Sequence, residues 1–365
     1  MNFTLQSLGL NPAIFAGHPG TPARVTAVHR ERFEVVTEFG PTHARLKTSV
    51  YFGAGDGDGE GGSAVAGMQF PTVGDAVTLQ LVPNGDSLVT ATLERRSFFS
   101  RRDPDKGRGE QAVAANFDYC LILGSLNRDF NLRRIERYLA LAWDSGAVPV
   151  VVLTKADLVE DSAEQVRAVE ELANFAEVIA VSTVTGAGLD RLARYLQPGK
   201  TAVFLGSSGV GKSTLINTLA GADLMVTSEI REDDARGRHT TTHRQLIVLP
   251  NGAMVIDTPG MRELGMWDAG AGLGATFADV EAVLARDCRF SNCGHNAEPD
   301  CAVLTAIAEA ELSQGRWDSY LKLQREAKYA ADRVTHARER GQMWKKWDSQ
   351  YRAATKEGFV KTIRH

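Results

Sequence analysis

What this 365-residue sequence lacks excludes several classes of protein. Its four cysteines are too few for a disulfide-dense secreted scaffold. The longest apolar run, AVPVVVL at 147–153, is far shorter than the roughly 20 residues that a membrane-spanning helix needs. Near the N-terminus, no basic segment precedes an apolar stretch of the kind found in secretory signals. We therefore expect a cytoplasmic protein without a membrane partner.

The chain also lacks an excess of one charge. Its 41 Lys and Arg residues face 45 Asp and Glu residues, which excludes a uniformly basic nucleic-acid binder. The mean hides a split, because residues 111–315 carry a balance of −10 and residues 316–365 one of +7. A basic end on an acidic middle indicates contact with polyanions, although charge-rich terminal helices are often merely solvated. Both interpretations stay open.

Residues 23–92 predict a small all-β barrel or meander, because short β-branched stretches alternate there with Gly, Pro and Asn-Gly turns. The glycine-rich loop at 53–62 resembles a calcium loop, but the glutamate that an EF-hand needs falls at Gly67. We interpret it as a flexible loop. The next segment, 94–111, packs six basic residues around two phenylalanines and predicts a linker, with RNA contact as a second reading.

From about residue 116 to 267, apolar strands alternate with helical stretches, which is typical of a parallel sheet covered on both faces. This alternation predicts an α/β domain over about residues 116–267. Residues 302–357 read as helical. The predicted strands are 119–125, 149–155, 177–182, 201–206, 245–250 and 253–258, and the helices include 132–146, 162–175, 188–196 and 213–221.

A phosphate-binding loop follows one of these strands, since residues 206–213 satisfy G-x-x-x-x-G-K-[ST] and open a helix. Backbone N–H groups can surround phosphates there, Lys212 can reach the terminal phosphates, and Ser213 can ligate Mg²⁺. A chance glycine-rich turn is the alternative. The expected nucleotide contacts are Gly206, Ser207, Ser208, Gly209, Val210, Gly211, Lys212, Ser213 and Thr214.

Two further elements suit a P-loop enzyme. Asp257 and Gly260 form D-x-x-G at the end of a strand, where an Asp is needed for Mg²⁺ and a Gly amide for the γ-phosphate. Alone this pattern also describes an ordinary turn. Between the two motifs, the segment GRHTTT (237–242) suits a switch loop whose threonine closes on Mg²⁺, with a plain threonine-rich strand start as the alternative.

Base selection is predicted from T-K-A-D at residues 154–157, which ends another strand. Asp157 can accept hydrogen bonds from the N1–H and 2-amino groups of guanine, which adenine cannot donate. Lys155 would lie along the base, and Ser182 belongs to a loop that would support the base oxygen. As a lone tetrapeptide the motif is common; its members are Thr154, Lys155, Ala156 and Asp157.

The order of these motifs is permuted, because the base-recognition motifs precede the P-loop and D-x-x-G. The chain closely resembles the RsgA (YjeQ) family of bacterial small-ribosomal-subunit biogenesis GTPases. The resemblance rests on this motif order, on the segments GSSGVGKST and DTPGMRELGMW, and on a cysteine–histidine cluster. The resemblance spans most of the chain, including RRSFFSR and AANFD before the first strand. It implies an OB-fold for the barrel. The chain departs from the general GTPase motif at Thr154, where Asn is usual, and in the insertion-like loop at 53–62.

The cysteine–histidine cluster offers three thiolates and one imidazole, enough for a closed, tetrahedral structural zinc site. Its spacing is not that of a two-knuckle finger, so the residues alone leave unligated thiols as an alternative; the resemblance matches it ligand for ligand. Cys120 reads as a core residue. The predicted ligands are Cys288, Cys293, His295 and Cys301.

The catalytic water poses a problem, because Met261 stands where Ras-like enzymes place a glutamine that orients it. Either turnover is negligible or another polar group serves. His239 is the nearest candidate by sequence, although a lone loop histidine is often idle, and the resemblance implicates the histidine of this stretch. We expect His239, Lys212 and Thr241 to be catalytic, and Ser213, Thr241 and Asp257 to form the Mg²⁺ shell.

These observations predict a multidomain protein: an OB-fold-like β-barrel and basic linker (1–112), a circularly permuted α/β GTPase domain (113–280) and an α-helical zinc-binding domain (281–365). The resemblance implies a monomeric, Mg²⁺-dependent GTPase in late assembly of the small ribosomal subunit, binding rRNA and leaving on hydrolysis. Two alternatives stay open: an RNA-binding assembly factor whose nucleotide switch has negligible turnover, and a permuted P-loop ATPase.

Overall fold

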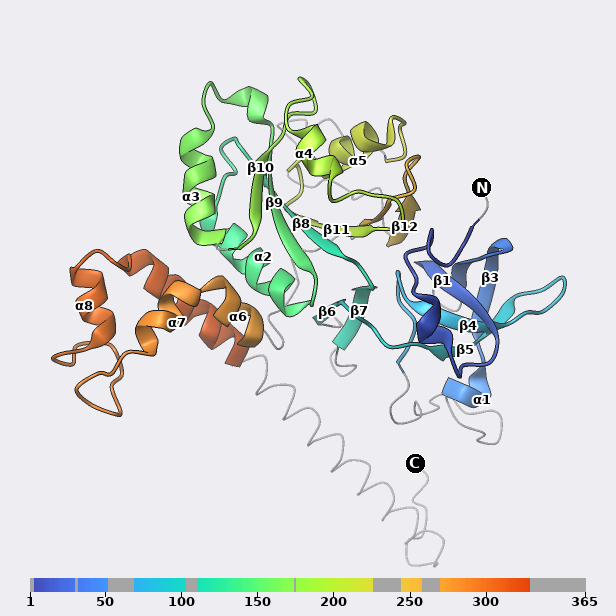
Figure 1. The fold of residues 1–365 in the computed structure, drawn as a ribbon, viewed down its shortest axis with the longest axis horizontal. Coiled ribbons are helices and arrows are strands. Elements are labelled where there is room, and N and C mark those ends of the chain that lie inside the picture. Colours follow the sequence, from blue (N-terminus) through green and yellow to red (C-terminus); the bar gives the residue numbers. More distant parts are fainter. Residues whose placement is uncertain are drawn as a thin grey trace, which may run out of the picture.

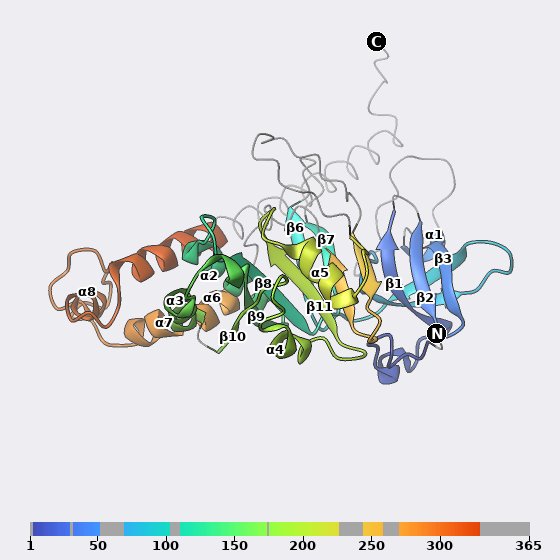
Figure 2. The same ribbon diagram turned by 90° about the horizontal axis from the view of Figure 1, so that it is seen from above.

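The structure is a computed structural model that describes residues 3–29, 32–51, 69–102, 110–173, 175–225, 244–257 and 270–328. Three parts follow one another along its long axis: a β-barrel, a central α/β layer and a group of helices (Figure 1). The view from above shows the same order (Figure 2). Within the described ranges, no helix combines the length and the apolar character needed to cross a membrane.

The barrel confirms the all-β prediction for the N-terminal part. Its strands run in the order β1-β2-β3-β5-β4, and β4 pairs with β1 to close it, with β3 and β5 parallel. Buried strand residues such as Val25, Val35 and Val89 fill its core. The strands are β1 (Thr21–Val28), β2 (Phe33–Thr37), β3 (Gly40–Leu46), β4 (Ala76–Gln80) and β5 (Ser87–Thr92); the short helices beside them are η1 (Pro12–Phe15) and α1 (Thr48–Tyr51).

The segment expected to be a linker contains two paired strands, so that prediction is wrong for its described residues. Strand β6 (Phe98–Arg102) pairs antiparallel with β7 (Glu110–Ala115). Phe99, buried in this hairpin, stacks on Phe117 with ring centroids 4.9 Å apart. The basic, proline- and glycine-containing composition obscured the strands, because β6 has only two apolar residues, Phe98 and Phe99, followed by three polar ones.

The central sheet has the order β10-β9-β8-β11-β13-β12. Its strands are parallel except β12, which pairs antiparallel with β13, so the prediction of an all-parallel sheet is wrong at this strand. One bridge between Ala27 and Gln245 joins β12 to the barrel. The strands are β8 (Tyr119–Ser125), β9 (Val148–Thr154), β10 (Glu177–Ala180), β11 (Thr201–Gly206), β12 (Gln245–Val248) and β13 (Met254–Asp257).

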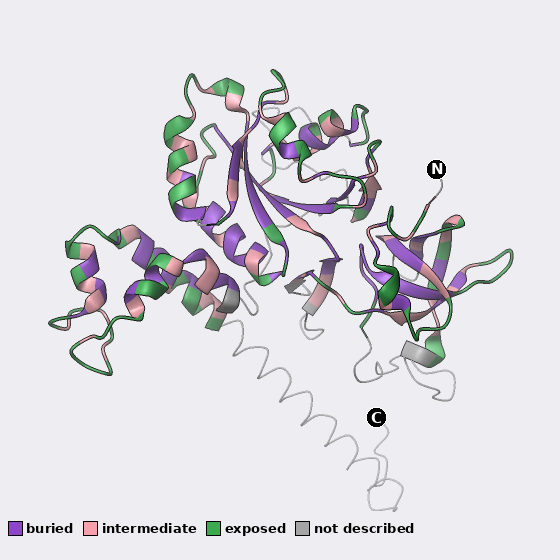
Figure 3. Ribbon diagram, in the orientation of Figure 1, coloured by how far each residue is buried: buried purple, intermediate pink, exposed green. Residues whose placement is uncertain are grey.

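Helices cover both faces of this sheet, which explains its nearly continuous apolar strands. Along β8, Cys120 and Ile122 face one core cluster while Leu121 and Leu123 face the other. Buried residues follow the strands, and exposed ones gather on loops and outer helix faces (Figure 3). The covering helices are α2 (Leu132–Asp144) and α3 (Ala163–Ala173) in the first cluster, and α4 (Leu189–Ala193) and α5 (Lys212–Ala220) in the second.

A buried arginine attaches the barrel to the central sheet. Arg24 of β1 is fully buried and donates to the carbonyls of Leu8 at 2.6 Å and Asn116 at 2.8 Å. It also donates to Thr201 Oγ1 at 2.9 Å, at the start of β11. Desolvation, with the nearby charge of Arg96, lowers the pKa of Arg24 to about 9. The guanidinium is therefore charged at neutral pH, and neutral acceptors hold it.

The C-terminal described region is helical, as predicted, and residues 309–313 separate its last two helices. Its core is continuous with that of α2, through Leu273, Phe277 and Trp317. A Cβ on Gly272 would overlap the carbonyl oxygen of Ala140, so α6 approaches α2 at backbone distance. The helices are α6 (Gly270–Thr276), α7 (Ala278–Leu284), α8 (Ala302–Ala308) and residues 314–328.

Candidate functional site

The predicted phosphate loop lies between the end of β11 and the start of α5. Gly209 and Gly211 have φ values of +79° and +97°, in the left-handed region that favours glycine. A Cβ on Gly206 would lie 3.0 Å from Val210 Cγ1 and 3.1 Å from Leu123 Cβ. These glycines let the backbone fold tightly before the helix, and the N-terminus of α5 can attract an anion.

Lys212 and Asp257 meet beside this loop. Lys212 follows β11 and Asp257 ends β13, the parallel strand beside it. Lys212 Nζ lies 2.9 Å from Asp257 Oδ1. Asp257 is buried and Lys212 is one-fifth exposed. Ser213 occupies the first turn of α5. The arrangement gathers a cation, a carboxylate and a hydroxyl where phosphate and Mg²⁺ chemistry would need them.

The structure joins the T-K-A-D segment to the P-loop, although Thr154 and Val210 are 56 positions apart. Thr154 Oγ1 donates to the carbonyl of Val210 at 2.6 Å, and Lys155 Nζ donates to that of Gly209 at 2.8 Å. Lys155 has a φ of +60°, which turns the chain sharply at the strand end. The strand's carboxyl end is thereby fixed against the loop.

A cavity of about 330 Å³ opens between these segments. On one side, Ser182 Oγ donates to Asp157 Oδ1 at 2.6 Å and so orients the carboxylate. Leu158 and Val184 line the cavity with side chains that are 61% and 80% exposed, an apolar rim that the sequence motifs did not identify. The lining residues are Thr154, Lys155, Asp157, Leu158, Val181, Thr183, Val184, Gly211 and Thr214.

Sequence reasoning also missed two charged residues at the P-loop. Arg134, in the first turn of α2, donates to Ser207 Oγ at 3.0 Å, and Ser207 Oγ donates to Asp129 Oδ2 at 2.8 Å. Arg134 and Asp129 form an ion pair at 2.7 Å. Hydrogen bonding to Asp129 raises the pKa of Arg134. No motif marks these residues, because they reach the loop from 73 and 78 positions away.

Several predicted residues lie outside the described residues. These are the switch segment with His239 and Thr241, together with Gly260 and Met261. Their predicted roles therefore stay predictions. The glycine-rich loop at 53–62 and the basic residues beyond 328 also lie outside the described part of the chain.

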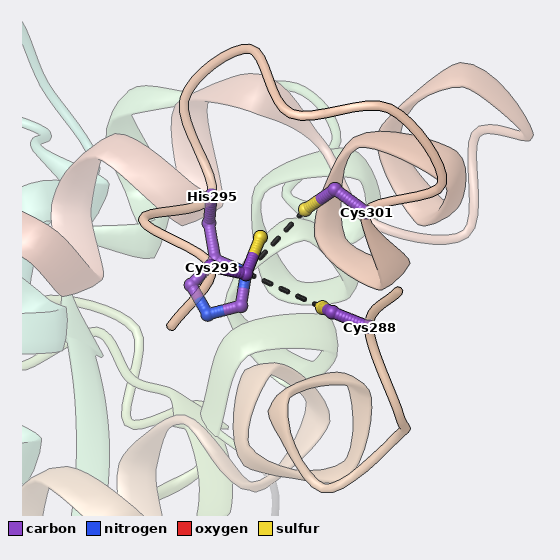
Figure 4. A group of neighbouring side chains, drawn as sticks. All are labelled: Cys288, Cys293, His295 and Cys301. Carbon is purple, nitrogen blue, oxygen red and sulfur yellow. Dashed lines mark hydrogen bonds between the residues drawn. The ribbon is translucent and has the colours of Figure 1, made fainter. Parts of the chain in front are cut away.

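The four predicted metal ligands converge at one point of the helical region, with all ligand atoms within 4.8 Å of one another (Figure 4). His295 Nδ1 lies 3.7 Å from Cys288 Sγ and 3.4 Å from Cys301 Sγ. Tetrahedral Zn²⁺, with bonds near 2.3 Å to sulfur and 2.0 Å to nitrogen, places its ligands about 3.5–3.8 Å apart. Desolvation, then the neighbouring Cys301 and Cys288 thiols, raises the pKa of Cys293 to about 11. A divalent cation would offset the cost of gathering thiolates here, so the donor set fits zinc.

Two residues support this cluster. Glu298 accepts backbone N–H groups of Gly294, Asn296 and Ala297 at 2.7, 2.8 and 3.0 Å, and these bonds lower its pKa to about 2. They fold the loop around His295, which has a φ of +55°. On the inner side, the His295 ring meets Trp317 edge-on at 5.9 Å. The cluster is thus anchored in the helical core.

Comparisons with known proteins agree with this geometry. The model of the RsgA GTPase family matches residues 92–267. The chain is 46% identical over 324 residues to small ribosomal subunit biogenesis GTPase RsgA 1 of Listeria monocytogenes, covering 88% of each chain. It is 42% identical over 361 residues to small ribosomal subunit biogenesis GTPase RsgA of Opitutus terrae, covering 94% of this chain and 95% of that protein.

Solved structures support the same fold at 24% sequence identity. YjeQ from Thermotoga maritima superposes with a TM-score of 0.59, covering 84% of this chain and 98% of that one. YloQ, described as a circularly permuted GTPase, superposes with a TM-score of 0.54, and the match covers 85% of this chain and 96% of that one. At 42–46% identity over 88–94% of its length, the chain belongs to the RsgA family of GTPases.

Proposed function

We propose that this chain is a GTP hydrolase that acts in late assembly of the small ribosomal subunit. The observation that supports the proposal is the hydrogen bond of Thr154 to Val210, because it joins the T-K-A-D segment to residues 206–213. Relatives named small ribosomal subunit biogenesis GTPase match along most of the chain and support the biological role.

Guanine selection rests on Asp157 in this proposal. The hydroxyl of Ser182 holds its carboxylate at one wall of the cavity, where it accepts hydrogen bonds from the N1–H and 2-amino groups of guanine. Adenine has no matching donors and would leave a carboxylate unpaired. Leu158 and Val184 provide apolar surface for the ring beside the stem of Lys155.

Phosphate handling rests on the loop from Gly206 to Ser213. Backbone N–H groups and Lys212 bind the β- and γ-phosphates, and Ser213 and Asp257 would hold Mg²⁺ together with Thr241. Mg²⁺ held by these residues would neutralise charge that develops on the phosphate oxygens. His239 then orients the attacking water, a role that Met261 cannot fill because a thioether is a weak hydrogen-bond acceptor.

The remaining parts of the chain would serve binding to the ribosome. We assign the barrel, up to about residue 112, and the helical region after about residue 280 to contacts with the small subunit and its rRNA, and we expect release on hydrolysis. The cluster of Cys288, Cys293, His295 and Cys301 would hold one structural zinc ion per chain. We expect a cytoplasmic monomer.

A nucleotide switch with negligible turnover is the second candidate, because Met261 replaces the usual glutamine. Measuring GTP and ATP hydrolysis with and without small subunits separates the two functions. We expect GTP-selective stimulation that His239→Ala mostly removes while GTP affinity stays near normal. The exposed His18→Ala is the control. Absence of stimulated turnover would favour the switch, and ATP-selective turnover would favour an ATPase.

The base site is tested by Asp157→Asn, measured by the binding of GTP and xanthosine triphosphate. The amide should weaken GTP binding and improve binding of the xanthine nucleotide, because it can donate to the xanthine oxygen. Asp190→Asn, at an exposed position on α4, is the matched control. Unchanged GTP affinity in Asp157→Asn would contradict the assignment.

A further inference from the structure

Helix α2 touches the P-loop at its first turn. Asn131 caps the helix by accepting from the backbone N–H of Arg134, and the Arg134 side chain reaches Ser207 Oγ at 3.0 Å. Asp129 holds both partners, through its ion pair with Arg134 and its hydrogen bond from Ser207. The position of α2 therefore sets the position of a P-loop side chain.

Two residues further along, the same helix is bound by the C-terminal helices. Glu136 is 2% exposed and accepts from Arg316 Nη1 at 2.9 Å and from Ser319 Oγ at 2.5 Å. We call this the Glu136 latch, consisting of Glu136, Arg316 and Ser319. The next residue, Arg137, pairs with Glu326 at 3.0 Å. The latch thus fixes α2 beside its P-loop contact.

The latch is itself held firmly. Arg316 donates to both carboxylate oxygens of Asp279 at 3.0 Å and to the carbonyl of Thr276 at 2.7 Å, and lies over the Phe277 ring at 4.3 Å. Separating a buried ion pair leaves its charges uncompensated, which is strongly destabilising. These contacts therefore hold Arg316 and Glu136 in one geometry. A change in the docking of residues 314–328 would therefore have to move α2 or break this network.

We propose that α2 couples docking of the C-terminal helices to the nucleotide site, with Arg134 as the positioning residue that acts on Ser207. Ser207 belongs to the P-loop, so a shift of its side chain moves backbone groups that would surround phosphate. Because such coupling is reciprocal, nucleotide binding also changes how tightly the C-terminal helices dock. This inference rests on the proposed nucleotide-binding function.

A double-mutant cycle tests the coupling. Ser207→Ala removes the P-loop end, and Glu136→Gln neutralises the latch while Arg316 keeps Asp279 as a partner. Each change should weaken the affinity of the full chain for a fluorescent GDP analogue about fivefold. The double variant should be weakened by clearly less than the product of the two effects. Additive effects would overturn the proposal.

Two further variants separate positioning from general destabilisation. Arg134→Lys should restore part of the affinity that Arg134→Gln loses, since an ammonium can still reach Ser207 and Asp129. Equal losses in the two would count against Arg134. Glu311→Gln breaks the exposed Arg286–Glu311 pair, which does not contact α2, and should leave GDP affinity unchanged. An equal loss in this control would also overturn the proposal.

The double-mutant cycle can still be measured if Glu136→Gln fails to fold. Ser319→Ala then replaces Glu136→Gln, because it removes one hydrogen bond and leaves both charges paired. Thermal unfolding of every variant shows whether it is folded. Failure of the unmodified chain to bind the GDP analogue would overturn the proposed function itself, whereas normal binding with additive effects would overturn only the coupling.

Discussion

Two buried arginines attach neighbouring parts of the chain to the central domain, and they do so in opposite ways. Arg24 binds neutral acceptors, including the carbonyls of Leu8 and Asn116, and desolvation lowers its pKa. For Arg316, desolvation also acts to lower the pKa, but hydrogen bonds and charges from Asp279 and Glu136 outweigh it and raise the pKa. At the barrel junction the charged group hydrogen-bonds to neutral acceptors, while the helical junction is an ionic network.

The two junctions also differ in their distance from the P-loop. Arg24 contacts Thr201 at the start of β11, and the P-loop begins at the opposite end of this strand, at Gly206. Arg316 contacts Glu136, two residues from the arginine that reaches Ser207. The barrel is therefore attached far from the P-loop, where we expect nucleotide binding to have little effect on docking. The C-terminal helices are attached close to the P-loop contact, where we expect a larger effect.

Metal removal should have the largest effect and should be confined to the helical side. We expect about one zinc per chain by elemental analysis. Chelation should raise hydrogen exchange in residues 270–328, while the barrel strands β1 to β5 keep their protection. Zinc binding supplies folding free energy to small sites of this type, on the order of 10 kcal/mol in isolated zinc-finger peptides.

Cysteine variants provide the control for the metal experiment. Cys293→Ser should lower the zinc content, whereas Cys120→Ala, in a buried strand, should leave it unchanged. A metal-free protein with native exchange rates in both regions would contradict a structural zinc site.

The barrel junction is tested by Arg24→Ala. The change removes the donor to the Leu8 carbonyl, leaves the carbonyls of Gly74 and Asn116 with one donor each, and empties the volume of a fully buried side chain. We expect the free energy of unfolding to fall by about 3–5 kcal/mol in urea titrations. Arg32→Ala is the control, because Arg32 is half exposed and its pair with Asp86 should contribute less than about 1 kcal/mol. Equal losses in the two variants would mean that burial of Arg24 is energetically unimportant.

These junctions mark the limit of what the sequence could predict. Local patterns predicted the glycine-rich loop before α5, the all-β character of residues 23–92 and the set of metal ligands. By contrast, Arg24 and Thr201 are 177 positions apart, and Glu136 and Arg316 are 180 positions apart, with no motif around either pair. Only the folded chain brings such partners together.

Strand β3 shows a second limit. It begins with Gly40 and Pro41, which indicate a turn, and Ala44 is its only fully buried residue. Its pairing with β2 and β5 comes from closure of the barrel, so tertiary context overrides weak local propensity. The apolar rim of the base cavity was missed for a similar reason, since exposed Leu158 and Val184 follow no recognisable period.

The helical junction can be disturbed without touching a charge. Gly272→Ala places a methyl group against the carbonyl of Ala140 on α2, and we expect a loss of about 1–3 kcal/mol from the forced separation of α6 and α2. Gly274→Ala lies on the same helix and has nothing within 4 Å, so it should be neutral or slightly stabilising. Thermal unfolding compares the two variants; equal behaviour would mean that α6 does not pack closely on α2.

The smallest expected effect concerns Glu298, which shapes the zinc loop without being a ligand. Glu298→Gln replaces one carboxylate oxygen with an NH2 group that cannot accept, so either the N–H of Gly294 or the N–H groups of Asn296 and Ala297 lose their acceptor. We expect zinc affinity to fall about tenfold in a competition titration at neutral pH, with Glu309→Gln, an exposed residue beyond the cluster, as the control.

The pH dependence of this support follows from the pKa of Glu298, about 2, which is lower than its ordinary value of 4.5. Stabilisation by a carboxylate with a lowered pKa is fully present above the unfolded value and is lost as the pH falls from about 4.5 toward 2. The affinity ratio between the unmodified chain and Glu298→Gln should therefore be constant from pH 6 to 8. A ratio that changes across this range would show that another group, and not this carboxylate, holds the loop around His295.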